Sequence, residues 1–250
     1  SSDLVKADLR LCDIQAGGLH NAIPREAHAV VAVPANRLEA LASDLQEYGQ
    51  RVKDEFSTTE PDATFVAEEV AVPADALTQT QTERIVKSLL VVHNGIFAMS
   101  QDIDDLVETS SNLANIKREG NQIVVNTSQR SSVASNLTYM AEVIRAGFEL
   151  GGAKCVTNEG YPGWKVNPKS EIVKVSVDSY KRLFNKEPKV RAIHAGLECG
   201  LFSEKYPNLD MVSFGPTLRG VHSPDERLLI PTVQLVWDHL LDILKNIPNK

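Results

Sequence analysis

Apolar positions in the first 150 residues alternate between strand-like and helix-like spacing. Alternation of apolar and polar residues predicts strands over residues 8–15, 27–33, 64–72, 106–117 and 121–130. Apolar residues at steps of three and four predict helices over residues 36–56, 79–92 and 132–150. Asn36 and Glu39 form the capping box expected at the start of the first helix. Gly95 is the expected end of the second helix. The pattern in this part of the chain therefore predicts an antiparallel sheet with helices packed on it.

The pattern changes after Gly152. Strands are predicted over residues 153–157, 190–194 and 211–214, and helices over 170–185, 197–206 and 231–247. Strands that alternate with helices predict part of a mostly parallel α/β sheet. Two or three short strands make a poor independent sheet, so this part is expected to be incomplete. The predicted class is therefore α/β, with one domain over residues 1–154 and a domain fragment over residues 155–250.

Composition narrows the function classes. The chain has 250 residues, 42% of them hydrophobic and 24% charged, as in an ordinary globular protein. The net charge of −7 argues against nucleic-acid binding through a basic surface. Residues 1–10 lack the apolar core of a signal peptide, and no apolar run approaches the ~20 residues that cross a membrane. The odd set Cys12, Cys155 and Cys199 has no paired spacing, which predicts free thiols in a reducing cytoplasm and excludes a cysteine zinc knuckle.

Candidate chemistry is densest in the segment that follows the predicted strand 211–214. Gly215 and Gly220 bracket a loop whose backbone could approach a ligand closely or offer it N–H groups. His222 follows, with Asp225 and Glu226 close behind. A neutral imidazole on such a loop is a good zinc ligand, and a nearby carboxylate can fix its tautomer. The alternative is a helix start, with Ser223 as N-cap, Pro224 at the first position and acids in the first turn.

This segment is one of several phrases that carry a resemblance to a known family. The others are Asn21-Ala22-Ile23-Pro24-Arg25-Glu26-Ala27, Asn94-Gly95-Ile96, Arg130-Ser131-Ser132, Tyr161-Pro162-Gly163-Trp164 and His194-Ala195-Gly196-Leu197-Glu198-Cys199-Gly200. In this order they resemble the aminoacylase-type dinuclear zinc exopeptidases, and within them the aminoacyl-histidine dipeptidases, also called dipeptidase D. The phrases span nearly the whole chain, and their combination is specific although each alone is weak.

The resemblance implies two zinc ions, or other divalent metals, in the full-length enzyme, with His222 as the last protein ligand of one of them. The family's other ligands lie in an N-terminal half, in a His-x-Asp motif, an Asp, a Glu-Glu pair and a further Asp. No His-x-Asp occurs here, and Glu68-Glu69 is better interpreted as solvated charge. The chain is therefore expected to be the C-terminal portion of such an enzyme. Residues 1–154 would form most of its lid domain and residues 155–250 the closing segment of its catalytic domain. No catalytic residue is expected in this portion, which alone should be inactive.

Two lid residues are candidates for substrate binding. The resemblance assigns Arg130 to the substrate's C-terminal carboxylate, which suits a guanidinium fork; the alternative is a surface ion pair. It assigns Asn21 to a hydrogen bond with the substrate; the alternative is a turn residue after Gly17-Gly18. Glu198 is expected near the site without an assigned role, and an acid in the first turn of a helix is an equal alternative. His239 falls in an amphipathic helix and is interpreted as structural.

The leading hypothesis is thus part of a cytoplasmic zinc dipeptidase that cleaves Xaa-His and similar dipeptides. Its partner would be the dipeptide, with neither nucleic acid nor membrane, and a homodimer is possible. Another peptidase or an N-acyl amino acid hydrolase of the same family is the narrow alternative. A non-catalytic binding or dimerisation module, in which the lid is the working unit, is the alternative from a different class. The coding sequence upstream of Ser1 would decide between these two classes. A His-x-Asp motif followed by a Glu-Glu pair would indicate the enzyme, and a natural start at Ser1 would favour the module.

Overall fold

The computed structural model describes residues 8–101, 103–158, 160, 164, 167, 169–191, 198–221 and 225–248, with Glu198 described by its backbone alone. The chain divides into two compact units. The first consists of Ser1–His93, Leu113–Thr127 and Ile144–Cys155, and the second of Asn94–Asn112, Ser128–Val143 and Val156–Lys250. Each unit thus draws on segments that are distant in sequence.

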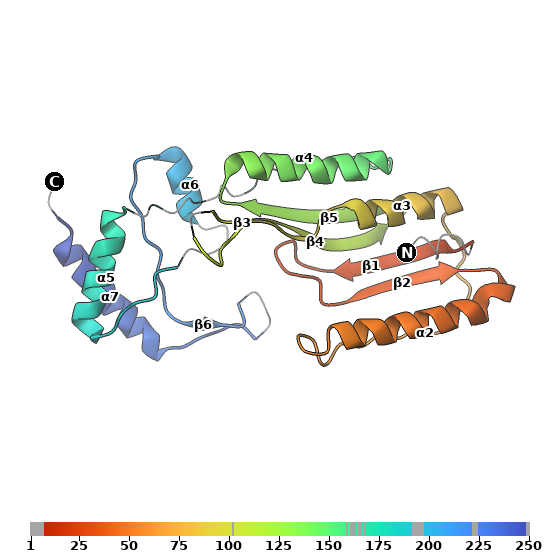
Figure 1. Ribbon diagram of the computed structural model, residues 1–250, viewed down its shortest axis with the longest axis horizontal. Helices are drawn as coiled ribbons and strands as arrows, with labels where there is room; N and C mark the ends of the chain where they lie inside the picture. Colours follow the sequence, from red (N-terminus) through yellow and green to blue (C-terminus); the bar gives the residue numbers. More distant parts are fainter. Residues whose placement is uncertain are drawn as a thin grey trace. The chain divides into compact units, whose positions relative to one another are not determined.

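A five-stranded sheet fills the first part of the chain (Figure 1). Its strands are β1 (Arg10–Gly17), β2 (Ala27–Ala32), β3 (Gly95–Met99), β4 (Val107–Glu119) and β5 (Gln122–Ser131). The order is β2-β1-β4-β3, and β5 also pairs with β4. The β1–β2, β1–β4 and β3–β4 pairs are antiparallel, with Gln15 opposite both His28 and Lys117. This confirms the antiparallel sheet that the alternating pattern predicts.

Three helices accompany this sheet at the predicted positions. They are α2 (Leu38–Glu55), α3 (Gln79–Val91) and α4 (Ala134–Leu150). On α4 the side chains of Met140, Ile144 and Phe148 are buried at steps of four, as the helical spacing predicts. The first unit also buries Leu11 and Cys12 of β1, and Cys12 is only 2% exposed. Helix periodicity is therefore a reliable guide in this part of the chain.

The predicted capping box at Asn36 is wrong. Asn36 lies inside a short 3-10 turn, Ala35–Arg37, and α2 begins after Arg37 with no side-chain cap. The capping box of this region is at α3 instead. There the Gln81 N–H donates to Thr78 Oγ1 at 3.2 Å, and the Thr78 N–H donates to Gln81 Oε1 at 2.9 Å. The turn that follows Pro34 carries the chain past Asn36 before the helix proper starts.

The strand predicted over residues 64–72 is also wrong: no strand is assigned to these residues, and Phe65 among them packs on a helix. The ring of Phe65 lies against Gly49 of α2, where an added Cβ would be 2.5 Å from Phe65 Cδ1. The Tyr48 and Phe65 rings meet edge to face with centroids 5.8 Å apart. Conversely, β3 was not predicted. Gly95 begins that strand at φ +105° and does not end α3, whose C-cap is Val92.

The part of the second unit beyond residue 156 is mainly helical. It contains α5 (Glu171–Phe184), α6 (Glu198–Lys205) and α7 (Pro231–Asn246), close to the predicted bounds. The strands β6 (Leu218–Arg219) and β7 (Arg227–Leu228) form a small antiparallel pair. No described helix is long and apolar enough to cross a membrane. Helices and antiparallel strands together confirm the α/β class.

Three strands predicted in this region are not found among the described residues. Residues 153–157, 190–191 and 211–214 are assigned to no strand, and residues 192–194 lie outside the described residues. In the described part of the chain, the pairs β1–β2, β1–β4, β3–β4 and β6–β7 are all antiparallel. A strand is stabilised by its neighbours through the hydrogen bonds between them. The strand predictions for residues 153–157, 190–191 and 211–214 are therefore wrong, and the prediction for residues 192–194 stays untested.

Candidate functional site

The end of β5, where Arg130 lies, is held by a chain of polar side chains that we call the β5-end cluster: Glu108, Thr109, Ser131 and Asn136. Asn136 Nδ2 donates to Glu108 Oε1 at 2.6 Å, and Thr109 Oγ1 lies 3.2 Å from the same oxygen. Thr109 Oγ1 and Ser131 Oγ are 2.8 Å apart, and Ser131 Oγ also accepts from the Val133 N–H at 3.0 Å. Thr109 is fully buried and Ser131 nearly so. Buried hydroxyls that are all hydrogen-bonded fix a single local geometry.

This geometry sets the direction of Arg130. Gln129 Nε2 donates to Ser111 Oγ at 3.2 Å, and Ser131 bonds to Thr109, so the residues on both sides of Arg130 engage β4. Strand alternation places the arginine on the opposite face, together with Ser128, as the sequence predicts. Arg130 is half-buried. A guanidinium held on a rigid strand end can bind a carboxylate through two parallel N–H donors.

Asn21 lies in the connection between β1 and β2. The Ala22 N–H donates to the Leu19 carbonyl at 3.3 Å, which makes a turn around this asparagine. Gly17, at φ +62°, donates its N–H to the Glu26 carbonyl at 3.1 Å and so closes the base of the connection. Asn21 is half-buried in this turn. The geometry suits a turn residue, and the substrate-binding role of Asn21 stays a prediction.

The other predicted site residues fall largely outside the described residues. His222 is one of them; β6 ends at Arg219 before it, and β7 begins at Arg227 after it. Of the two glycines that precede it, Gly220 adopts φ +61°, whereas Gly215 has open space where a Cβ would be. Residues 161–163 and 192–197, and the Glu198 side chain, also lie outside the described residues. Among the residues that are described, no three His, Cys, Asp or Glu side chains gather as a metal site would require.

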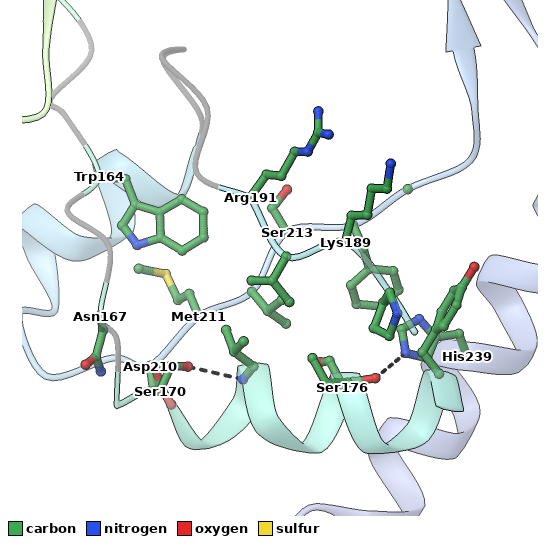
Figure 2. Close-up of a pocket in the computed structure, with 18 of the residues that line it drawn as sticks. Trp164, Asn167, Ser170, Ser176, Lys189, Arg191, Asp210, Met211, Ser213 and His239 are labelled. Carbon is green, nitrogen blue, oxygen red and sulfur yellow. Dashed lines mark hydrogen bonds between the residues drawn. The ribbon is translucent and has the colours of Figure 1, made fainter. Parts of the chain in front are cut away.

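The second unit contains a cleft of about 1680 Å³ that sequence reasoning did not predict. It lies between one face of α5 and α7 and the segments 188–191 and 207–217 (Figure 2). At one end, Asp210 Oδ2 accepts from the Ile172 N–H at 3.0 Å (Figure 2), at the N-terminus of α5. Desolvation raises the pKa of Asp210, but hydrogen bonds from Ser170 and from the first N–H groups of α5 outweigh it and lower the pKa overall. This carboxylate caps a helix.

At the other end of the cleft is His239 of α7. It is buried, and its Nε2 lies 2.9 Å from the Ser176 carbonyl oxygen of α5, so Nε2 carries the proton and donates it. The rings of Phe214 and Tyr180 lie 4.8 and 5.5 Å from the imidazole, centroid to centroid. This confirms the structural interpretation of His239. Asp210 and His239 are both engaged by the fold, so they do not form an acid–base pair for catalysis.

Comparisons of the sequence and of the structure with known proteins both find dipeptidases. No family model matches the chain. The cytosol non-specific dipeptidase of Escherichia coli K12 is 38% identical over 243 residues, which are 97% of this chain and 50% of the relative. The crystal structure of aminoacylhistidine dipeptidase from Vibrio alginolyticus matches 99% of this chain and 50% of its own, with 40% identity and a TM-score of 0.85. The chain thus spans about half the length of both proteins, and over nearly all of its own residues it is similar to these dipeptidases.

Proposed function

We propose that this chain is the C-terminal part of a cytoplasmic, zinc-dependent dipeptidase. The observation that carries the proposal is the joint agreement of sequence and fold. Identities of 38% and 40% extend over nearly the whole chain, and the TM-score with a solved dipeptidase is 0.85. The motif phrases from Asn21 to Glu226 support the same half of the enzyme. In this proposal residues 1–154 belong to the lid and residues 155–250 to the catalytic domain.

The proposed substrates are dipeptides, with Xaa-His among them. One relative is named a non-specific dipeptidase and the other an aminoacylhistidine dipeptidase, so a broad range that includes histidine at the second position fits both names. A dipeptide offers a free carboxylate at a fixed distance from its scissile bond. We assign the binding of that carboxylate to Arg130 and a further hydrogen bond to Asn21.

The residues of this chain supply too few ligands to form a two-zinc site on their own. A protein zinc ion takes at least three protein ligands, and a pair of ions needs more. His222 is the single ligand that we propose in this half, and the described residues offer no cluster that could complete the set. This chain alone therefore supports no metal-dependent step. Its own part in the reaction is to bind and orient the substrate and to supply one ligand.

Arg130 can orient a substrate because its strand end is rigid. The β5-end cluster is hydrogen-bonded, and Thr109 and Ser131 within it are buried, so the backbone that carries Arg130 is held in place. A bidentate, charge-assisted contact from a desolvated site is worth roughly 2–5 kcal/mol. If the contact is made in the transition state, its loss appears in kcat/KM.

The test uses the full reading frame that contains this sequence. Zinc-loaded protein should hydrolyse Xaa-His and other dipeptides, and Arg130→Ala should lower kcat/KM by about 30-fold or more, which corresponds to roughly 2 kcal/mol. Lys87→Ala is the control, because Lys87 is 67% exposed and pairs with Glu83 one helical turn away. The control should keep its kcat/KM within about twofold.

Two results would contradict the proposal. A full-length protein that hydrolyses no dipeptide when loaded with zinc would remove the enzymatic function. An Arg130→Ala variant within twofold of the parent would leave the enzyme but make Arg130 structural. The homodimer stays a prediction, which sedimentation of the full-length protein tests directly.

A further inference from the structure

The end of the sheet where Arg130 lies has a covered face and an accessible face. Thr109 and Ser131 are buried on the covered face, and α4 runs along β5 (Figure 1). Ser110 and Arg130 lie on the other face, because successive side chains of a strand alternate, and both are half-buried. Ile96 of β3 pairs with Ser110 and is 57% exposed. The described residues of the second unit therefore leave this face accessible beside Arg130.

Three hydrogen bonds between β4 and β5 fix the register of the two strands at this end. They join the pairs Thr109–Ser131 at 2.8 Å, Ser111–Gln129 at 3.2 Å and Glu108–Ser132 at 3.1 Å. The residue number rises on one strand as it falls on the other, as in an antiparallel pair. Arg130 therefore lies opposite Ser110. Two residues along the same face, Ser128 lies opposite Asn112.

The two sides of Arg130 on the accessible face differ in charge. Toward the strand end is Glu108, whose carboxylate accepts from Asn136 of α4 at 2.6 Å. On the other side are Asn112 and Ser128, which are half-buried and uncharged and lie about 7 Å further along their strands. An anion bound by Arg130 is repelled by the acid but not by the uncharged pair. The rest of such a ligand is therefore favoured on the side of Asn112 and Ser128.

The chemistry of a dipeptide determines what reaches this pair. The carboxylate and the side chain of its second residue are attached to the same carbon, so a carboxylate held by Arg130 keeps that side chain close to the guanidinium. A side chain of the length of histidine or lysine can span the distance to the neighbouring pair on the face. We propose that Asn112 and Ser128 form the subsite for the side chain of the substrate's second residue. The inference rests on the proposed function, in which Arg130 binds the carboxylate.

The residue types of this subsite fit a broad choice of second residue. A carboxamide and a hydroxyl can each donate and accept hydrogen bonds, so they can bond to either tautomer of an imidazole. Neither group carries a charge, so the subsite neither selects nor rejects a charged side chain by its sign. A charge introduced at Asn112 or Ser128 should therefore create a selectivity that the parent lacks.

The test changes the charge of the subsite in the full-length, zinc-loaded protein. Asn112→Asp should raise the ratio of kcat/KM for Ala-Lys to that for Ala-Glu by at least about tenfold, because the new carboxylate attracts the ammonium group and repels the acid. Ser128→Asp should shift the ratio in the same direction, and it covers the case in which the first variant fails to fold. A residue with a merely structural role would not produce this gain of selectivity.

Gln122→Glu is the matched control, because it makes the same change from amide to carboxylate at an exposed position of β5. It lies six residues from Ser128, or about 20 Å along the strand, which exceeds the screening length of about 8 Å at physiological salt. The control should keep the selectivity ratio within about twofold of the parent.

Ratios that stay within about twofold of the parent in Asn112→Asp and Ser128→Asp would overturn the inference, as would an equal loss of activity on both dipeptides. Calorimetric Kd values of Ala-Lys and Ala-Glu, measured on the full-length protein without metal, give the same ratio without turnover. A shifted Kd ratio in a protein that hydrolyses no dipeptide when zinc is added would support the subsite and refute the proposed function alone. A full-length protein that neither binds nor hydrolyses these dipeptides would overturn both.

Discussion

At the scale of single residues, Gly17 at the end of β1 is a tightly constrained backbone position. It adopts φ +62°, and a Cβ there would lie 2.1 Å from the Ala114 carbonyl oxygen of β4. Its neighbour Gly18 has nothing within 4 Å of its Cβ position. The two glycines are adjacent in sequence, yet only the first is required by the way β1 approaches β4.

Gly17→Ala should therefore destabilise the protein by at least about 1–2 kcal/mol. Left-handed backbone costs roughly that much for a residue with a Cβ, and the clash with a backbone carbonyl adds to it. Gly18→Ala should change the free energy of unfolding by no more than about 0.5 kcal/mol. Urea unfolding of the two variants and the parent measures both values. Equal stability of the two variants would show that β1 can move away from β4.

The β5-end cluster gives a second residue-scale prediction. Thr109→Val keeps the shape of the side chain but removes the hydroxyl that lies 2.8 Å from Ser131 Oγ and 3.2 Å from Glu108 Oε1. Loss of a partner from a buried polar network costs about 1–3 kcal/mol. Thr138→Val on α4 is the control, because its hydroxyl is exposed and bonds to the Ala134 carbonyl within the same helix. Thermal unfolding should separate the two, and a harmless Thr109→Val would show that the cluster does not fix β5.

Sequence reasoning performed unevenly at this scale. It identified Arg130 as a strand-end residue with a defined face, and His239 as structural, because strand and helix periodicity determine the side on which a residue lies. It could not find the hydrogen bonds that hold Glu108 to Asn136, since their partners are 28 residues apart and polar residues carry no periodic signal. The same limit applies to Asp210, which caps a helix that begins 39 residues before it.

At the scale of elements, α5 shows how a helix start depends on distant residues. Ser170 Oγ accepts from the Val173 N–H at 3.1 Å, and Asp210 Oδ2 accepts from the Ile172 N–H at 3.0 Å. The helix ends at Asn185, whose φ of +48° is the left-handed cap that Asn tolerates. Its local signals are therefore strong at both ends, which is why the predicted bounds of α5 are accurate.

The lowered pKa of Asp210 leads to a pH-dependent prediction. A carboxyl whose pKa is depressed by folding stabilises the fold when ionised, above its unfolded pKa of about 3.9, and loses that effect as pH falls through its folded pKa. Asp210→Asn should thus lower stability at pH 7 by about 0.5–1 kcal/mol, as for a weakened helix cap. The gap between parent and variant should close below pH 4. A gap of constant size from pH 7 to pH 3 would contradict this assignment.

Helices were predicted more accurately than strands for a physical reason. The hydrogen bonds of a helix are local, so Ala134–Leu150 and Pro231–Asn246 form from their own sequence once one face is buried. A strand depends on its neighbours. Within the apolar run at residues 64–72 Phe65 packs on α2, and residues 211–214 pair with no described strand. Neither outcome can be read from the alternation of residues within the segment.

At the scale of the whole molecule, the homologous dipeptidases are about twice as long as this chain. We expect the 250-residue chain to bind zinc weakly at most and to hydrolyse no dipeptide, because one proposed ligand cannot hold two ions. Metal analysis after dialysis and a dipeptide assay measure both. Stoichiometric, tightly held zinc together with hydrolysis by this chain would contradict the expectation and would require ligands that our interpretation does not include.

Because Cys12 is buried in the first unit, the rate at which its thiol reacts should depend on how often that unit opens. Burial is the main cause that raises the pKa of this thiol, and a raised pKa leaves little of the reactive thiolate. Cys155 and Cys199 are half-buried and should react first. Alkylation of Cys12 must then await the transient separation of β1 from its surroundings. The slow phase of alkylation would report how often the first unit opens, without any mutation, and would do so separately from events in the second unit.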